Sequence, residues 1–191
     1  ATGVRPEDAM KLANLAASVV VGKSGTASLC PGEFIKSARP FTSETALPNI
    51  VEKTAQWRNE HLRIGFTNGC FDLLHPGHLE VLFSTKQRCD RLIVAVNSDD
   101  SVRRLKGIGR PVMDQATRAA ILQSLPDVDG VVIFDEDTPS KAIDAIIPDL
   151  LTKGGDYRAE DIIGYKTVSE TGGQVVIIGL KAGYSTSALL R

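Results

Sequence analysis

Two histidines that stand three positions apart have the clearest chemical use in this chain. His75 and His78 belong to the run His-Pro-Gly-His, and the chain has only three histidines. Side chains three apart on a helix share a face, so both imidazoles can reach one ligand. Pro76 suits the first position of a helix, where free amides and the positive dipole end attract anions. The motif predicts a polyphosphate site that stabilises charge developing during phosphoryl or nucleotidyl transfer.

Two other interpretations of the histidine pair stay open. The two residues can be ordinary surface or helix-capping residues, or they can be zinc ligands. Zinc is the weaker alternative, because Cys30, Cys70 and Cys89 include no close pair and no further histidine follows His78. We therefore predict no metal site built from protein side chains alone.

The elements that must position the histidines are a buried strand and a helix. Residues 63–67 are short and mostly apolar, Gly69 offers a permissive turn, and 77–88 has helical character. Later segments alternate between the two types, with strands expected at 92–96, 130–134, 150–153 and 175–179 and helices at 116–125 and 140–147. This order predicts an α/β protein with a Rossmann-like, doubly wound parallel sheet. Such sheets bind ligands at the carboxyl ends of their strands, where the motif lies.

Further polar residues are candidates for the same site. Lys106 lies in a glycine-containing loop that can fold over a triphosphate, and Arg118 lies near a helix start. Each alone is more often a solvated surface charge. Lys153 and Asp156 flank two glycines that allow close backbone approach, although a simple turn explains them equally well. A hydroxyl-rich helix start that can clamp a phosphate is formed by Ser185, Thr186 and Ser187.

Composition limits the class of protein. The chain has 191 residues, is 42% hydrophobic and carries a net charge of -1, which gives no general attraction to nucleic acid or membrane. No apolar run is long enough to span a bilayer, and no signal-peptide pattern opens the chain. Three cysteines without a disulfide framework suit a reducing cytosol. We expect a cytoplasmic protein without a nucleic-acid or membrane partner; the absence of Gly-x-Gly-x-x-Gly argues against a dinucleotide cofactor.

The composition changes near residue 40. Residues 6–22 form an apolar helical pattern, 38–48 are rich in Pro, Ser and Thr, and a polar helix is expected at 49–61. Gly22-Lys23-Ser24 suggests a P-loop, but the required first glycine is Ala17 and the segment ends a helix. We predict an N-terminal appendage at 1–40, a linker and helix at 41–61, and the catalytic domain at 62–191.

The motif resembles the signature of a known family. Residues 67–78 are similar to the HxGH nucleotidyltransferases, and 69–78 look most like the adenylyltransferase part of the bifunctional ADP-heptose synthases of lipopolysaccharide assembly. The resemblance covers essentially everything from Arg63 to the end, with further matches at 92–99, 104–107, 110–112, 136–139, 148–151 and 153–157.

The resemblance implies an activity and a set of site residues. AMP would pass from ATP, with Mg²⁺, to a sugar 1-phosphate, giving an ADP-sugar and pyrophosphate; the expected sugar is D-glycero-β-D-manno-heptose. Catalytic roles fall on His75, His78 and Lys106. Nucleotide-binding roles fall on both histidines and on Thr67, Asn68, Gly69, Cys70, Phe71, Arg118, Ser185, Thr186 and Ser187. Substrate-binding roles fall on Asp72, Asn97, Lys153, Gly154, Asp156 and Tyr157.

The first forty residues resemble a different enzyme. Residues 12–27 are similar to the C-terminal end of a ribokinase-type sugar kinase, which implies a covalently linked kinase domain in the parent protein. The kinase's catalytic Asp motif would lie upstream of Ala1, so we expect no kinase activity from this chain. A homodimer is also expected, because open-edged sheets of this kind often pair.

Three rival functions remain. The first is transfer of CMP to glycerol 3-phosphate or another polyol or alcohol phosphate, although Leu180-Lys181 stands where the glycerol-phosphate enzymes carry Arg-Thr. Tyr184 and Ser187 also depart from the family's Ile-Ser-Thr-Thr motif. The second is a non-catalytic nucleotide-binding module. The third is a folded fragment whose activity needs the kinase.

Overall fold

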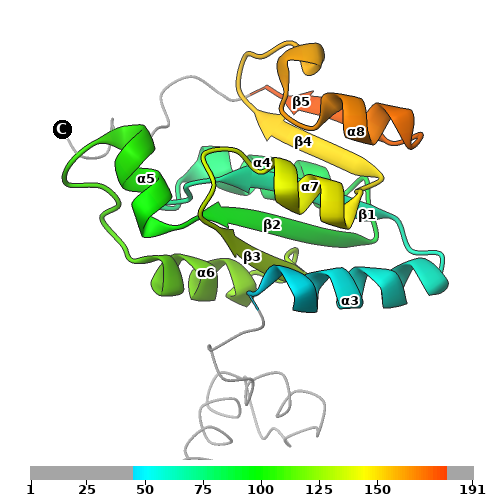
Figure 1. Cartoon of the computed structure of the whole chain (residues 1–191), viewed down its shortest axis with the longest axis horizontal. Coiled ribbons are helices and arrows are strands. Elements are labelled where there is room, and N and C mark those ends of the chain that lie inside the picture. The colour runs from blue at the N-terminus through cyan, green and yellow to red at the C-terminus, as the bar shows by residue number, and fades with distance from the viewer. Residues whose placement is uncertain (1–44, 180–191) are drawn as a thin grey trace, which may run out of the picture. The chain divides into compact units, whose positions relative to one another are not determined.

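A single parallel sheet of five strands organises the part of the chain that the structure describes (Figure 1). The computed structural model describes residues 45–179, which belong to a unit that spans 44–191. The strands are β1 (Ile64–Gly69), β2 (Arg91–Asn97), β3 (Gly130–Phe134), β4 (Leu150–Gly154) and β5 (Gln174–Ile178). The helices are α3 (Leu47–Asn59), α4 (Pro76–Lys86), α5 (Asp99–Lys106), α6 (Gln115–Ser124), α7 (Ser140–Ile146) and α8 (Tyr165–Glu170), with a 3₁₀ turn η1 (Ala159–Asp161). The predicted fold class is confirmed.

The strand order places a switch point at the centre of the sheet. The order is β3-β2-β1-β4-β5, so the chain builds outward from β1 on one side and then returns to add β4 and β5 on the other. Strands β1 and β4 pair in parallel, with Gly65 opposite Leu150 and Thr67 opposite Thr152. Ligands of open α/β sheets bind outside the carboxyl ends of the strands at such a point. The motif with both histidines follows β1 directly.

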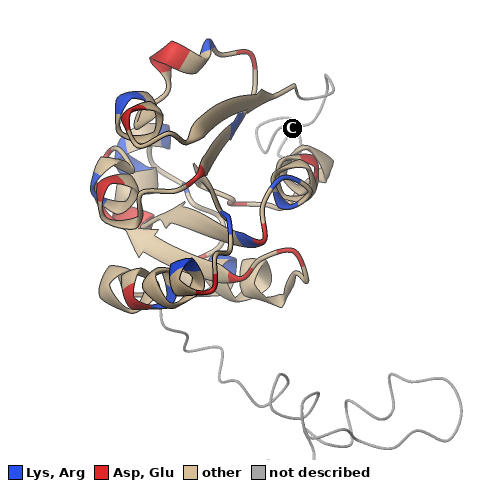
Figure 2. Cartoon of the chain, turned by 90° about the vertical axis from the view of Figure 1, so that its right-hand side faces the viewer, with Lys and Arg blue, Asp and Glu red and all other residues tan. Residues whose placement is uncertain are grey.

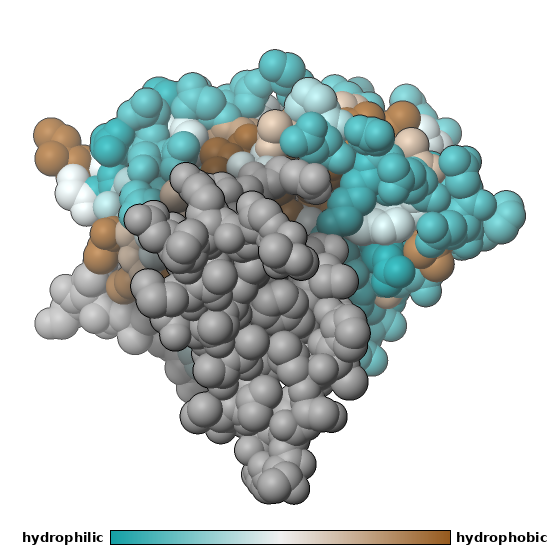
Figure 3. Space-filling model, turned by 90° about the horizontal axis from the view of Figure 1, so that it is seen from below, coloured by the Kyte–Doolittle hydropathy of each residue, from teal (hydrophilic) through white to brown (hydrophobic). Residues whose placement is uncertain are grey.

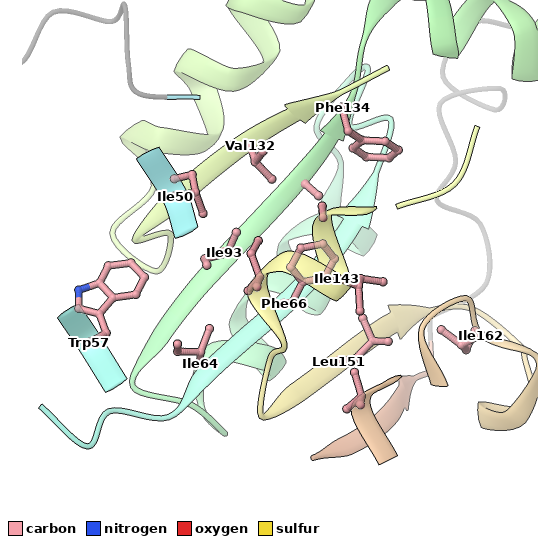
Figure 4. Close-up of a cluster of buried hydrophobic side chains, with 14 residues drawn as sticks. Ile50, Trp57, Ile64, Phe66, Ile93, Val132, Phe134, Ile143, Leu151 and Ile162 are labelled. Atoms are coloured by element: carbon pink, nitrogen blue, oxygen red, sulfur yellow. The ribbon is translucent and has the colours of Figure 1, made fainter. Parts of the chain in front are cut away.

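Two apolar clusters hold the helices on opposite faces of the sheet. Successive residues of β2 alternate between them: Ile93 and Ala95 join one cluster, while Leu92, Val94 and Val96 join the other. The first cluster contains residues of α3, α7 and α8, and Figure 4 shows its side chains. The second contains Leu82 of α4 and two residues of α6. Because β2 is buried on both faces, its sequence is continuously apolar, as in central parallel strands.

Charged side chains lie mainly on the helices and loops around the sheet (Figure 2). On the face that Figure 3 presents, hydrophilic residues cover most of the described surface and hydrophobic ones form small areas. The described helices include none that is long and apolar enough to cross a membrane.

Helices α5 and α8 were not expected from the sequence. Lys106 is therefore the last residue of α5 and does not lie in a loop, as we had predicted; the loop begins at Gly107, which has φ +90°. Helix α5 is short and mostly polar, and Val102 and Leu105 are its only apolar residues. Its start is fixed by Ser98, whose side chain accepts a hydrogen bond from the Ser101 N–H. The prediction of a helix near 49–61 is confirmed by α3. The predicted boundary at residue 40 and Ser185, Thr186 and Ser187 lie outside the described residues.

A chain of buried hydroxyl groups ties α4 to the switch point. The Thr85 hydroxyl donates to the Val81 carbonyl oxygen at 2.6 Å and lies 2.7 Å from the hydroxyl of Thr152. Since the one proton of Thr85 goes to Val81, Thr152 must donate to Thr85. The Thr67 hydroxyl of β1 donates to the Thr152 carbonyl oxygen at 3.1 Å. These contacts link the helix that carries His78 to the two central strands.

This proton assignment predicts an asymmetry between two substitutions. Thr85→Val removes an acceptor and leaves the buried Thr152 hydroxyl without one, which costs about 1–3 kcal/mol of unfolding free energy. Thr152→Val removes only the donor and costs about 1 kcal/mol. Urea denaturation of both variants and of the double variant measures these costs. A double variant that is less stable than the sum of the single losses, or a larger loss for Thr152→Val, contradicts the assignment.

Candidate active site

The two histidines lie with their rings stacked at the start of α4. His75 is the N-cap residue, with extended backbone at φ -139° and ψ 165°, Pro76 is the first helical residue, and His78 lies in the first turn. The ring centroids are 3.7 Å apart and the ring planes are inclined by 21°. His75 is 8% exposed. The spacing therefore brings both imidazoles to one place, as predicted.

The Phe71 ring packs against the ring of His78. Its ring centroid lies 5.0 Å from that of His78, and the residue is buried in the second apolar cluster. Its backbone has φ +46°, a left-handed conformation that costs energy for a residue with a side chain. The predicted turn at Gly69 is thus made by Phe71. Gly69 is needed for another reason, since a Cβ atom there would lie 3.2 Å from the Phe71 ring.

Burial keeps both histidines neutral at pH 7. It lowers the pKa of His78 to about 4, and the nearby His75 adds to this shift. Burial also lowers the pKa of His75. Within the described residues, neither Nδ1 atom has a hydrogen-bond partner. Buried polar atoms are seldom left unpaired, and such atoms at a helix start suit a polar ligand. The imidazoles can therefore act as neutral hydrogen-bonding groups for an anion.

The start of α4 adds a backbone donor. The His78 N–H already donates to the His75 carbonyl oxygen at 2.9 Å. The prediction of free amides at this helix start therefore does not hold for His78. The Gly77 N–H has no partner in the part of the chain that the structure describes. Together with the positive end of the helix dipole, this amide favours an anion beside the rings.

Four cationic side chains surround the thiol of Cys70 at the end of β1. Burial raises the pKa of this thiol, while the charges of Lys106, Arg118, Lys153 and Arg110 act in the opposite direction. Each of these groups is therefore close enough to stabilise a negative charge at Cys70. Lys106 and Arg110 lie four positions apart, while Arg118 and Lys153 come from α6 and β4, and together they produce a positive potential at the end of β1, where the turn to the histidines begins.

Lys153 occupies the switch point itself. Its ammonium donates to the carbonyl oxygen of Asn68 at 3.1 Å and to its side-chain oxygen at 3.2 Å. Burial lowers the pKa of Lys153, and Lys106 lowers it further. Beyond it, Asp156 and Tyr157 are exposed. Gly155 has φ +127°, and a Cβ atom there would lie 2.8 Å from the Tyr157 ring. Gly154 ends β4, so the four predicted substrate-binding residues of this segment lie at one strand end.

Asp72 has a structural role in place of the predicted contact with substrate. It is 1% exposed, and its carboxylate accepts hydrogen bonds from Arg110 Nε at 2.6 Å and from the N–H groups of Val112 and Met113 at 2.7 and 3.1 Å. These contacts fasten the loop after α5 to the histidine turn. Arg110 was not among the residues that sequence reasoning assigned to the site, because nothing in its spacing distinguishes it from a surface charge.

Three more residues that we predicted to bind a ligand have side chains that bond to other parts of the protein. The Thr67 hydroxyl bonds to β4 as described above, and the Asn97 side-chain amide donates to the Ser101 hydroxyl at 3.0 Å. Arg118 has a fully buried side chain whose three guanidinium nitrogens all donate to protein oxygens. These residues hold the loops around the site.

The described residues contain no group of three His, Cys, Asp or Glu side chains that could hold a metal ion. Asp72, the acidic residue of the motif, is already paired with Arg110.

Comparison with known proteins supports this interpretation. Residues 66–187 match the model of the cytidylyltransferase-like family. The chain is 46% identical to the bifunctional protein HldE of Bradyrhizobium sp. (strain ORS 278), 48% to that of Rhodopseudomonas palustris (strain BisB18) and 47% to that of Nitrobacter hamburgensis. Each alignment covers 100% of this chain and 40% of the relative, so the chain spans about two fifths of their length.

Two solved structures are similar in fold. The lipopolysaccharide core biosynthesis protein of Thermoplasma volcanium superposes with a TM-score of 0.53 at 27% identity, covering 65% of this chain and 99% of that one. Pantoate-beta-alanine ligase of Francisella tularensis superposes with a TM-score of 0.50 at 15% identity, covering 70% and 66%, which shows a shared fold alone.

The pKa shifts predict the titration of His78 in the ligand-free protein. We expect its ring proton resonances to titrate with a midpoint near pH 4 in NMR spectra. In a His75→Gln variant the midpoint should rise, because the neighbouring charge is gone, yet stay below 6.5, because burial is the larger cause. A wild-type midpoint at or above 6.5 would show that the rings are solvated or paired with an anionic group.

Proposed function

The chain belongs to the cytidylyltransferase-like family of nucleotidyltransferases, and from this we propose that it transfers AMP from ATP to a sugar 1-phosphate, giving an ADP-sugar and pyrophosphate. The proposed acceptor is D-glycero-β-D-manno-heptose 1-phosphate. Supporting observations are the identity of 46–48% with bifunctional HldE proteins and the fold shared with a lipopolysaccharide core biosynthesis protein. The observation that carries most weight is the stacked, neutral histidine pair, which follows a strand end that Lys106 and Lys153 make positive.

The proposed reaction is a direct displacement at the α-phosphorus. A phosphate oxygen of the sugar 1-phosphate forms a new P–O bond, and the bond from the α-phosphorus to the α,β-bridging oxygen breaks. Pyrophosphate leaves with the bonding electrons, so no covalent enzyme intermediate is required. Catalysis then depends on aligning two anionic reactants and on stabilising the charge that moves to the leaving group.

The side chains around the motif suit these two tasks. In our proposal His75 and His78 donate hydrogen bonds to the α- and β-phosphates, and the Gly77 N–H and the α4 dipole add a fixed positive potential. Lys106 neutralises charge on the leaving pyrophosphate, while Mg²⁺ bound to the triphosphate would supply further charge neutralisation. Ser185 and Thr186, which lie outside the described residues, remain candidates for the leaving end.

The acceptor would approach from the end of β4. Lys153 is placed to attract its phosphate, and the exposed Asp156 and Tyr157 lie where hydroxyl groups of a sugar could contact them. An acidic side chain accepts hydrogen bonds from sugar hydroxyls without needing a buried site. The proposed mechanism requires neither the proposed homodimer nor a kinase domain in a longer parent chain.

A second candidate is transfer of CMP to glycerol 3-phosphate or a related alcohol phosphate. The description of the matching family as cytidylyltransferase-like favours it. Pyrophosphate release with ATP, CTP, UTP and GTP, each offered heptose 1-phosphate or glycerol 3-phosphate, separates the two. We expect release only with ATP and the heptose phosphate. Release only with CTP would replace our proposal, and no release with any pair would favour a non-catalytic module or a dependence on further segments.

Substitution of His78 tests the role of the pair. His78→Ala removes one transition-state donor, so we expect kcat to fall about 100-fold, equivalent to about 3 kcal/mol. The matched control is His61→Ala, which makes the same change at an exposed histidine that precedes β1. Steady-state assays of both variants, with circular dichroism to confirm folding, decide the matter. Equal turnover in the two variants is incompatible with the proposed role.

A further inference from the structure

We propose that Arg118 is a positioning residue that sets Lys106 beside Cys70, at the start of the turn that leads to the histidine pair, by joining three segments of the chain, and that it is not a phosphate ligand. This inference rests on the proposed function for its catalytic consequence, while the contacts that carry it are independent of any reaction. Arg118 lies in the first half of α6, and its side chain has no exposed surface.

The three nitrogens of the guanidinium bond to three different segments. Nη2 donates to the Asp99 carboxylate at 2.7 Å, Nη1 to the Cys70 carbonyl oxygen at 2.5 Å, and Nε to the Met113 carbonyl oxygen at 3.0 Å. Asp99 begins α5, Cys70 begins the turn that leads to the histidines, and Met113 ends the loop between α5 and α6. A single planar group therefore fixes the distances among these segments.

Two of these segments carry part of the proposed site, because α5 ends at Lys106 and the turn after Cys70 leads to the histidines. Helix α5 runs from Asp99 to Lys106, and a helix of this length is a short rigid rod of about 12 Å. Its first residue is held twice by α6, because the Asp99 N–H also donates to the Gln115 side-chain oxygen at 2.9 Å. Fixing the start of α5 sets the direction of its last residue. Figure 1 shows α5 beyond the carboxyl end of β2, on the same edge of the sheet as the motif.

The same contacts argue against direct binding of phosphate by Arg118. A guanidinium that bound a triphosphate would have to give up buried hydrogen bonds to Asp99, Cys70 or Met113. Removing one partner of a buried pair leaves the other without compensation, which is costly. Lys106, by contrast, is exposed and is the last residue of α5, so its ammonium can reach a ligand.

Lysine cannot replace arginine in this role. A lysine can keep the charge pair with Asp99, but it is a point charge on a flexible stem and cannot reproduce the three-way planar geometry. Arg118→Lys should therefore loosen α5 and the turn at Cys70 while leaving the overall charge unchanged. Asp99→Asn, which weakens the same ion pair from its partly exposed partner, is the second variant and carries the test if Arg118→Lys does not fold.

The experiment is a double-variant cycle on kcat, with the ATP dissociation constant as a readout that needs no turnover. We expect Arg118→Lys to lower kcat about tenfold or more and to change the ATP dissociation constant less than twofold. In a Lys106→Ala background the same change should lower kcat by little further, because the effect passes through Lys106. Additive losses, no effect of Lys106→Ala, or weaker ATP binding as the main effect of Arg118→Lys would overturn the proposal.

Hydrogen exchange separates this inference from the proposed function. In Arg118→Lys the amides of 99–106 and of 70–75 should exchange faster than in the wild type, with β5 unchanged as the internal control. Faster exchange is expected even if no combination of nucleotide and sugar phosphate releases pyrophosphate. In that case the proposed function fails and the positioning role of Arg118 stands. Unchanged exchange in both segments would overturn the positioning role whatever the activity.

Discussion

The pairing of β1 with β4 is the constraint on which the arrangement of the site depends. Because the strand order reverses there, the chain leaves β1 toward α4 and leaves β4 toward the Gly154–Tyr157 segment, so two loops with different side chains open beside each other. Lys153 bridges the two by bonding to Asn68, and the buried threonines fasten α4 to the same strands. The histidines thus lie at the start of a helix that is bonded to the two central strands.

Electrostatics at this point combine neutral rings with surrounding cations. Burial favours the uncharged form of both imidazoles, and Lys106 and Lys153 contribute positive charge around Cys70, at the start of the turn that leads to them. A site of this kind attracts an anion without placing two charged rings 3.7 Å apart, which would cost repulsion in the free protein. An incoming polyphosphate would supply the hydrogen-bond partners that the rings lack. The same burial that keeps the rings neutral in the free protein would strengthen their contacts with a ligand.

Sequence reasoning reached the fold and the centre of the site but not the framework between its parts. Apolar runs identified the strands that the structure describes, because the central strands are buried on both faces and the edge strands β3 and β5 still carry short apolar runs, and the His-Pro-Gly-His spacing placed two rings together. Helix α5 escaped detection because it is short and mostly polar. Residues such as Asp72, Asn97 and Arg118 were assigned to ligands because a sequence shows their type and not their partners. Only the structure reveals that their polar atoms are already engaged by other segments.

The measurement that tests the account most directly is a crystal structure with a non-hydrolysable ATP analogue and Mg²⁺. The account predicts the α-phosphate within hydrogen-bonding distance of imidazole nitrogens of His75 and His78, with Lys106 against the β- or γ-phosphate and Arg118 still bonded to Asp99. A triphosphate bound elsewhere, or one that leaves both imidazoles without a contact, would contradict the claim that the stacked pair is the centre of nucleotidyl transfer.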